Sequence, residues 1–275
     1  MGDELLYELP GGGHALFTTR ADGNVSSVGG IGHEHGHDVR ERLRTRLGLR
    51  ALARGYQVHG TTVLSIRDRT ELFDPGSDSH PGPDSHSANG PDSNSTIGQP
   101  SIRADGHVTS VTGVGAMVLA ADCLPVALGC EGAVAMVHAG WRGLAAGVLE
   151  EGIRALREQG PVVGAGEITA VIGPGAGPCC YEVGPEVHAA FDAEALSSGM
   201  VDSERSRSET SPLEQAAGAP NKTIDLKSIA RMRLLAAGVR RVDDAGVCTI
   251  CDERFFSHRR EGADAGRQAG IAWLG

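Results

Sequence analysis

Short apolar runs alternate with amphipathic stretches along this chain, and that alternation constrains the fold more than any other feature. The runs at residues 117–121, 133–137 and 168–172 are typical of short buried strands. Amphipathic helices are expected at four places: residues 39–47, 141–159, 185–196 and 226–237. The last of these begins after a capping Asp225 and ends at Gly238. Elements that alternate in this way favour one α/β or α+β core, which 275 residues can fill.

Two polar segments cannot contribute to that core. Residues 74–101 consist mainly of Ser, Pro, Gly, Asp and Asn, and residues 197–222 are similar but less extreme. Such segments bury too little apolar surface to offset the conformational entropy lost on ordering. Motifs that belong to one site lie on both sides of each segment. We therefore interpret both segments as flexible surface loops within a single domain spanning residues 1–275.

Charge and the N-terminal residues bear on partners and location. The net charge is −10, and Lys and Arg are scattered rather than gathered into the basic face that nucleic-acid binding favours. The first residues lack the basic and apolar regions of a signal peptide, and no apolar run approaches the roughly 20 residues of a membrane span. We expect a cytoplasmic protein that binds neither nucleic acid nor membrane. In that compartment its six cysteines would not form a disulfide framework.

Three potential metal ligands lie in separate segments of the chain. Cys123 follows a predicted strand directly, and His138 lies at the end of the next one. Neighbouring strand ends would bring these two side chains together, and His59 offers a third ligand from a distant segment. Two imidazoles and one thiolate suit Zn²⁺, and three protein ligands leave one position open, as in catalytic sites. The spacing alone also allows another interpretation, in which all three are ordinary core residues.

Longer motifs resemble those of the YfiH-like laccase-domain family. In chain order they begin at Phe17 (FTTR), Gln57 (QVHG), Asp122 (DCLP), His138 (HAGWRG), Ile172 (IGP), Tyr181 (YEVG), Cys248 (CT), Phe255 (FFSHRR) and Gly266 (GRQA). This resemblance implies an α+β fold, a four-layer α-β-β-α sandwich with mixed sheets. It also implies that His59, Cys123 and His138 hold zinc.

The same resemblance implies an activity. Family members are described as purine nucleoside phosphorylases that also act as adenosine deaminases and methylthioadenosine phosphorylases, so purine nucleosides and inorganic phosphate are the expected partners. The alternatives are a copper-dependent polyphenol oxidase and a hydrolase with a peptidoglycan-editing role, in which Cys123 is the nucleophile and His138 the base. A multicopper site would need repeated His-x-His and His-Cys-His sets, which the chain lacks. We expect a monomer or a homodimer.

Several residues near the expected ligands are assigned roles in the reaction. Cys123 and Asp122 are the expected catalytic residues, with Asp122 transferring a proton or supporting the metal ligand. Gln57, Arg142 and Arg260 are the expected substrate-binding residues. Arg142 lies at a predicted helix N-terminus, and the planar guanidinium of arginine binds phosphate oxygens in pairs. The alternatives are that Asp122 forms a turn and that the arginines make surface ion pairs.

The remaining cysteines carry weaker signals. Cys248 and Cys251 have the spacing of half a zinc or redox motif, but no second pair has the same spacing. We therefore assign them to packing or to support of the metal site. The adjacent Cys179 and Cys180 are expected to be structural.

Overall fold

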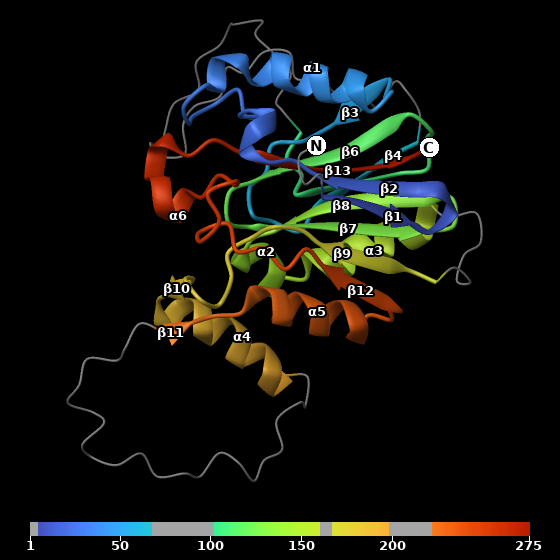
Figure 1. Ribbon diagram of the computed structural model, residues 1–275. Coiled ribbons are helices and arrows are strands. Elements are labelled where there is room, and N and C mark those ends of the chain that lie inside the picture. Colours follow the sequence, from blue (N-terminus) through green and yellow to red (C-terminus); the bar gives the residue numbers. More distant parts are fainter. Residues whose placement is uncertain (1–4, 68–101, 160–166, 198–221) are drawn as a thin grey trace, which may run out of the picture.

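A computed structural model describes residues 5–67, 102–159, 167–197 and 222–275. In these ranges the chain forms four layers, with helices outside two sheets that face each other (Figure 1). The expected α-β-β-α sandwich with mixed sheets is therefore confirmed. The polar segments 74–101 and 197–222 lie almost wholly outside the described residues. Among the helices that are described, none has the length and apolar character needed to cross a membrane.

The first sheet has five strands. Their order is β1 (Leu5–Leu9), β2 (Gly13–Phe17), β13 (Gln268–Leu274), β6 (Val114–Ala120) and β3 (Ala51–Ala53). All pairings are antiparallel except that of β3 with β6. Helix α1 (Gly36–Arg46) covers the outer face, where Val39 and Leu43 pack in one cluster with Met117 and Ile271.

The second sheet has six strands and carries the larger core. Their order is β12 (Arg241–Asp244), β9 (Thr169–Ile172), β7 (Leu124–Cys130), β8 (Ala133–Ala139), β5 (Gly106–Thr109) and β4 (Val63–Ile66). Helices α3 (Val148–Gln159) and α5 (Leu226–Ala236) cover its outer face. Leu149 and Ile153 of α3 are buried against Leu128 and Val137, as the periodicity of that helix predicts.

Mainly aliphatic side chains fill the space between the sheets. Phe17 and Val118 from the first sheet meet Ala127, Met136 and Val171 from the second. Chains poor in aromatic residues must fill a core in this way, and aromatics are only 4% of this sequence.

The expected helix over residues 141–159 is divided into two. Helix α2 (Trp141–Ala145) ends early, and α3 begins after Gly147, whose φ of 95° is in the left-handed region. Arg233 of α5 donates hydrogen bonds to the carbonyl groups of Leu144 and Ala145 at this break. These bonds satisfy carbonyl groups that would accept backbone hydrogen bonds in a continuous helix. The periodicity of residues 141–159 cannot reveal this contact, because Arg233 is distant in the sequence.

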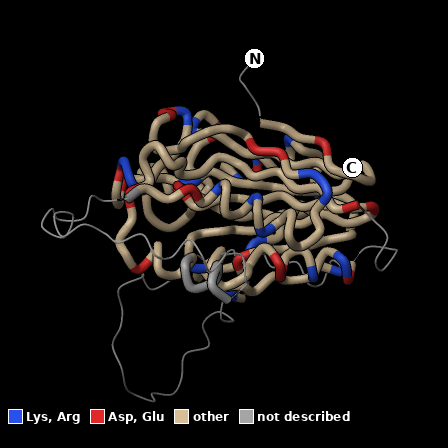
Figure 2. The backbone as a smooth tube through the Cα atoms, turned by 90° about the horizontal axis from the view of Figure 1, so that it is seen from below, with Lys and Arg blue, Asp and Glu red and all other residues tan. Residues whose placement is uncertain are grey.

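The remaining elements lie at the ends of the sheets. They are α4 (Pro185–Ser197), the pair β10 (Glu182–Val183) and β11 (Lys222–Thr223), the short α6 (His258–Glu261) and the 3-10 turns Pro10–Gly12, Arg20–Asp22, His33–His35 and Gly262–Asp264. Of these, α6, β10 and β11 lie at one end, and the turn Pro10–Gly12 lies beside the β7–β8 turn at the other (Figure 1). Asp225 caps α5 by accepting a hydrogen bond from the Ser228 amide, as expected. Seen from below, Lys and Arg are interspersed with Asp and Glu over the described surface (Figure 2).

Candidate metal and substrate site

Cys123 lies where the chain crosses from one sheet to the other. Strand β6 ends at Ala120 in the first sheet, and β7 begins at Leu124 in the second. Asp122 in the crossover has a φ of 89°, a strained value for a residue other than glycine. Because β7 and β8 are antiparallel, with Pro125 opposite His138, the start of β7 lies beside the end of β8. The two residues are therefore neighbours, although through a strand start and a strand end rather than two strand ends.

The structure brings His59, Cys123 and His138 together. One potential ligand atom from each lies within 4.8 Å of the others, and Cys123 Sγ is 3.7 Å from His59 Nε2. His138 is buried, Cys123 is partly buried and His59 is exposed, so the cluster opens toward solvent on one side. A Cβ atom on Gly140 would lie 2.6 Å from His59 Cδ2 and 3.0 Å from Cys123 Sγ. Only glycine at this position leaves both side chains where they are.

Asp105, which the sequence analysis missed, positions two of these three residues. Its fully buried carboxylate contacts His138 Nδ1 at 2.9 Å and accepts hydrogen bonds from the amides of Val58, His59 and Gly60 at 3.1, 2.9 and 2.8 Å. These bonds hold His59 at a φ of 58°, in the left-handed region. They also direct the other ring nitrogen of His138 toward the cluster. The only local signal is an acidic residue directly before a buried strand.

Cys123 and His138 form a mutually stabilised charge pair. Burial by itself would raise the pKa of the Cys123 thiol, but the charge of His138 and hydrogen bonds from both histidines lower it to about 6. Burial would lower the pKa of His138, but the Cys123 thiolate and the Asp105 carboxylate raise it to about 9. A thiolate is the form in which cysteine binds metals.

The donor set and its spacing fit a single zinc ion. Ligand bonds of about 2.3 Å to sulfur and 2.0–2.1 Å to nitrogen at a tetrahedral angle separate the two donor atoms by roughly 3.6 Å. The Cys123 Sγ to His59 Nε2 distance of 3.7 Å agrees with this value. Three donors would leave one position of a tetrahedral ion open.

Asp122 links Cys123 to the C-terminal segment. Its Oδ1 atom accepts a hydrogen bond from the Thr249 hydroxyl at 2.7 Å, and its Oδ2 atom accepts one from the Arg259 amide at 2.7 Å. The side chain is buried, and each of its carboxylate oxygen atoms accepts one of these hydrogen bonds. This arrangement fixes the strained crossover before Cys123, while a role of Asp122 in proton transfer stays a prediction.

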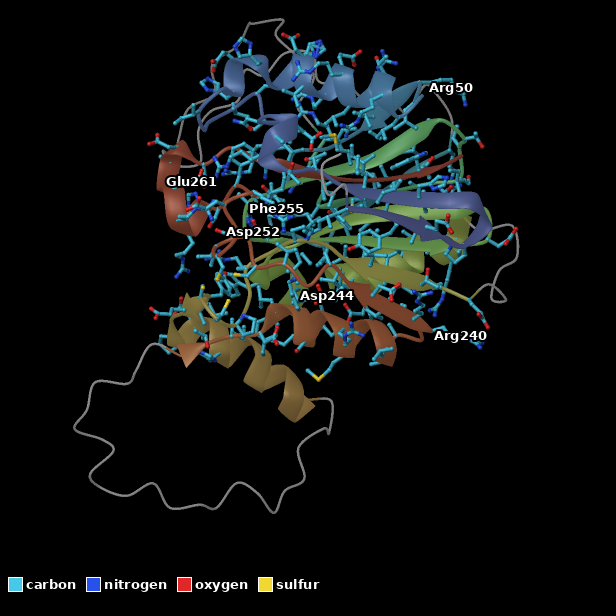
Figure 3. All side chains as sticks on the ribbon, viewed as in Figure 1. Arg50, Arg240, Asp244, Asp252, Phe255 and Glu261 are labelled. Atoms are coloured by element: carbon cyan, nitrogen blue, oxygen red, sulfur yellow. The ribbon has the colours of Figure 1, made fainter. Side chains whose placement is uncertain are left out.

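Two of the expected substrate-binding residues make extensive contacts with the backbone. The side-chain amide of Gln57 donates to the Leu119 carbonyl at 2.7 Å and accepts from the Leu119 amide at 2.8 Å. Arg260 donates to the carbonyl groups of a loop and to Glu261. Figure 3 labels Phe255 and Glu261, two of its partners, at the end of the molecule where α6 lies. These contacts join Gln57 to the end of β6 and Arg260 to the loop before α6, while a role of either residue in substrate binding stays a prediction.

Arg142 and Arg259 are placed differently, beside aromatic rings. The guanidinium of Arg142 lies 4.3 Å from the Trp141 ring centre, and that of Arg259 lies 5.2 Å from the Tyr181 ring centre. Burial raises the pKa of Tyr181, and the negative charge of Cys123 raises it further, while both arginines oppose these effects. Tyr181 therefore lies within electrostatic reach of both the cysteine and the arginines.

A pocket of about 280 Å³ adjoins these aromatic residues. Its lining includes Trp141, Tyr181, Arg259, Glu182 and Glu186. Aromatic faces next to the Arg259 guanidinium suit a ligand with a flat heterocycle. Nothing in the sequence indicates that Trp141 and Tyr181 line a common pocket.

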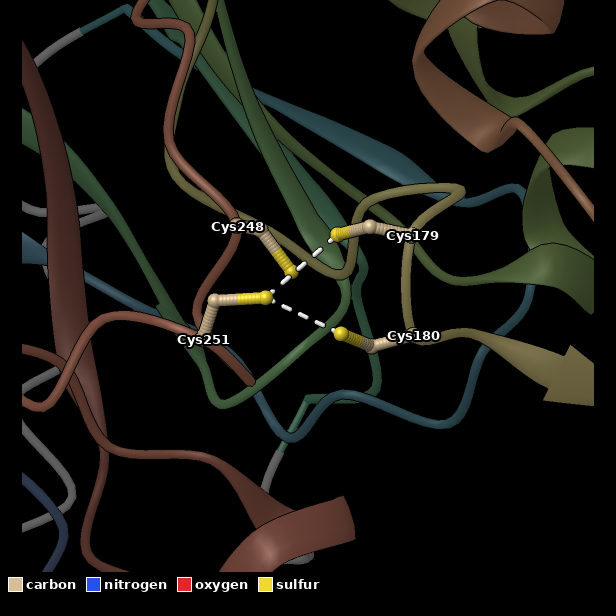
Figure 4. A group of neighbouring side chains, drawn as sticks. All are labelled: Cys179, Cys180, Cys248 and Cys251. Carbon is tan, nitrogen blue, oxygen red and sulfur yellow. Dashed lines mark hydrogen bonds between the residues drawn. The ribbon is translucent and has the colours of Figure 1, made fainter.

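The four remaining surface cysteines also come together, which the sequence analysis did not foresee. Cys179 and Cys180 follow β9, whereas Cys248 and Cys251 follow β12, and their sulfur atoms form one group (Figure 4). The signal was present as two cysteine pairs of different spacing. Pairs of unequal spacing do not form a recognisable zinc motif in the sequence.

Comparisons with known proteins agree with this fold. Residues 15–275 match the family described as multi-copper polyphenol oxidoreductase laccase. The structure is similar to the crystal structure of a Neisseria meningitidis protein, with a TM-score of 0.72, 28% identity and 99% of each chain covered. It is also similar to that of YlmD from Geobacillus stearothermophilus, with a TM-score of 0.70, 25% identity and coverage of 96% of this chain and 92% of that one.

Two curated relatives carry a functional name. A Xylella fastidiosa protein (strain Temecula1) named purine nucleoside phosphorylase is 37% identical over 279 residues, covering 98% of this chain and 90% of that protein. The Escherichia coli K12 protein named purine nucleoside phosphorylase YfiH is 36% identical over 181 residues, which cover 63% of this chain and 65% of that protein.

Proposed function

This chain belongs to the multi-copper polyphenol oxidoreductase laccase family, and on that premise we propose that it is a zinc-dependent purine nucleoside phosphorylase. The observation that carries the proposal is the cluster of His59, Cys123 and His138, which packs against Gly140. The next residue, Trp141, lines a pocket together with Tyr181 and Arg259. The relatives named purine nucleoside phosphorylase support the reaction class.

We assign the residues around the pocket and the cluster the following roles in binding and catalysis. Trp141 and Tyr181 stack on the purine, because aromatic rings bind the π-face of a base. Arg142 and Arg259 hold phosphate against the ribose, because planar guanidinium groups pair with phosphate oxygens. Zinc held by the cluster would act as a Lewis acid that polarises an oxygen atom of a bound ligand. Asp105 keeps His138 in one orientation throughout.

The ligands available favour a single ion such as zinc over a multicopper centre. In the described ranges, two groups of His, Cys, Asp or Glu side chains are close enough to share an ion. One has two histidines and one cysteine, and the other has four cysteines. Neither supplies the several histidines that a multicopper centre needs. We also propose that adenosine deamination and methylthioadenosine phosphorolysis occur in the same pocket, in a cytoplasmic monomer or homodimer.

The deciding experiment measures metal content and turnover in one preparation. Zinc and copper are determined in the purified protein, and inosine is then offered with and without inorganic phosphate. We expect zinc, phosphate-dependent release of hypoxanthine together with ribose 1-phosphate, and slower conversion of adenosine to inosine. Oxygen-dependent oxidation of a phenol by a copper-loaded protein, with no attack on inosine, would overturn the proposal.

Arg142 separates phosphorolysis from deamination, because only phosphorolysis needs bound phosphate. A charge-assisted hydrogen bond is worth roughly 1.5–3 kcal/mol, so Arg142→Ala should raise the phosphate KM by about one to two orders of magnitude. Zinc content and adenosine deamination should change little. Arg154→Ala is the matched control, since Arg154 is exposed on α3 and pairs only with Glu151 and Glu158 among the residues described. Equal loss of both activities would show that Arg142 supports the architecture of the site instead.

A further inference from the structure

The four cysteines that follow β9 and β12 are the strongest unassigned feature of the molecule. All four are free thiols, and their sulfur atoms all lie within 4.8 Å of one another. We propose that Cys179, Cys180, Cys248 and Cys251 bind a second zinc ion through four thiolates, and that this ion is structural rather than catalytic. The proposal goes beyond the proposed function and does not depend on it.

The sulfur positions match the requirements of such an ion. Four Zn–S bonds of about 2.3 Å in tetrahedral arrangement place the sulfur atoms roughly 3.8 Å apart. Cys179 Sγ and Cys180 Sγ lie 3.4 and 2.9 Å from Cys251 Sγ, so an ion requires only a small outward shift (Figure 4). A disulfide would need about 2.05 Å. Four protein ligands close the coordination sphere, which is the pattern of structural zinc.

The backbone around Cys248 is arranged to hold an anionic sulfur. The Gly177 amide donates to Cys248 Sγ at 3.2 Å, and amides of Ile250 and Cys251 also lie close enough to favour its thiolate form. Such amide contacts orient and stabilise thiolate ligands. A Cβ atom on Gly177 would lie 3.0 Å from Cys248 Cβ and 3.4 Å from Cys179 Sγ. The glycine therefore lets the two cysteine loops approach.

The two loops come from strands that already pair, so the site needs no rearrangement of the fold. Strands β9 and β12 are parallel neighbours, and beyond them Gly175 forms a bridge with Cys248. The Thr249 amide donates to the Gly175 carbonyl at 3.1 Å. An ion at the cysteines would join these loops covalently at the point where Thr249 reaches Asp122. Two of the cysteines, Cys179 and Cys251, are exposed, so metal can enter and leave.

The test counts zinc ions when each group is removed. The purified wild-type chain should hold two zinc ions, and Cys123→Ala should hold one. Cobalt(II) loaded into Cys123→Ala should give the intense visible absorption of a cobalt tetrathiolate, because the remaining site has only sulfur ligands. A folded Cys123→Ala chain with no bound metal, or with iron in its place, would overturn the proposal.

A second arm removes the cysteine group itself. The double variant Cys179→Ser/Cys251→Ser should lose one zinc ion and show a lower Tm, while Cys130→Ala, a buried cysteine outside both groups, should keep two. If the double variant does not fold, alkylation of Cys123→Ala answers the same question. The four cysteines should resist iodoacetamide with zinc bound and react after chelation. A disulfide among them in zinc-free purified protein, or equal alkylation with and without zinc, would contradict the proposal.

Discussion

The two groups of side chains that we propose as metal sites differ in donor number, burial and support. The first, formed by His59, Cys123 and His138, has mixed nitrogen and sulfur donors, reaches into the core and is oriented by the buried Asp105. The second has four cysteines, lies on two loops, and is contacted mainly by backbone amides. Three donors leave an ion able to bind a further ligand, whereas four donors do not. Donor count and rigidity thus separate a site suited to chemistry from one suited to stability.

The contacts that hold each site in place differ in the same way. Asp105 uses its carboxylate to fix both a histidine ring and the strained turn that carries His59, so side-chain and backbone contacts of the protein itself orient the first site. The cysteine loops are joined by the pairing between Gly175 and Cys248 and by the Thr249 amide. We infer that an ion adds little order to the first site and more to the second.

The largest expected effect comes from removing a ligand at the first site. Cys123→Ala should lower kcat/KM for inosine phosphorolysis by at least about 1,000-fold, because a metal ion contributes several kcal/mol to transition-state stabilisation. The Tm should fall little. His59→Ala should behave in the same way, and this separates the proposal from a cysteine hydrolase, which needs only Cys123 and His138. Activity that survives His59→Ala with zinc absent would contradict a zinc enzyme.

A smaller effect should follow from weakening the support of the first site. Asp105→Asn keeps the shape but removes the charge that faces His138, and changes to such outer partners lower metal affinity about 10- to 100-fold. The loss is measured by competition with a chelator of known affinity. Zinc at the four cysteines should be unaffected, which makes the second site an internal control. Equal weakening of both sites would indicate a general loss of structure and break the distinction between them.

Thr249 connects the two groups, and its effect should be smaller still. Thr249→Val removes the hydroxyl that donates to Asp122 while keeping the shape of the side chain. A hydrogen bond to a charged group contributes roughly 1.5–3 kcal/mol, so the free energy of unfolding should decrease by about that amount. Phosphorolysis should fall by less than about tenfold, since no ligand is lost. Thr249→Ser should restore both properties, whereas unchanged stability in Thr249→Val would show that the link has no influence.

The sequence predicted those parts of the molecule that depend on local patterns or on long motifs. The helices α1, α4 and α5 follow from apolar periodicity and from the cap at Asp225, and the proximity of His59, Cys123 and His138 follows from family motifs. The break between α2 and α3 depends on Arg233, which is distant in sequence. Asp105 and the cysteine group depend on strand pairing, since β5 lies beside β8 and β9 beside β12. Contacts made only through sheet pairing leave little trace in a single sequence.

Replacing His107 should have the smallest effect on either site. The variant also serves as a control for experiments that compare the two sites at low pH. His107 lies on β5, two residues after Asp105, with 1% of its surface exposed. Neither ring nitrogen makes a hydrogen bond of normal geometry within the described structure. Burial lowers the pKa of His107 to about 4, while the Met117 backbone and the Asp105 charge oppose this effect only partly.

The direction of the resulting pH dependence follows from this lowered pKa. The unfolded chain takes up the proton near pH 6.5 and the folded chain only near pH 4, so stability falls as the pH decreases between these values. At pH 5 the loss should be about 2 kcal/mol. His107→Met, a buried apolar replacement, should remove this loss in urea unfolding curves while leaving metal content at neutral pH unchanged. If zinc leaves the first site at pH 5 equally in wild type and His107→Met, protonation of the ligands causes the release. If His107→Met keeps its zinc at pH 5 while the wild type loses it, partial unfolding around β5 is the cause. Low pH then cannot be used to compare the two sites.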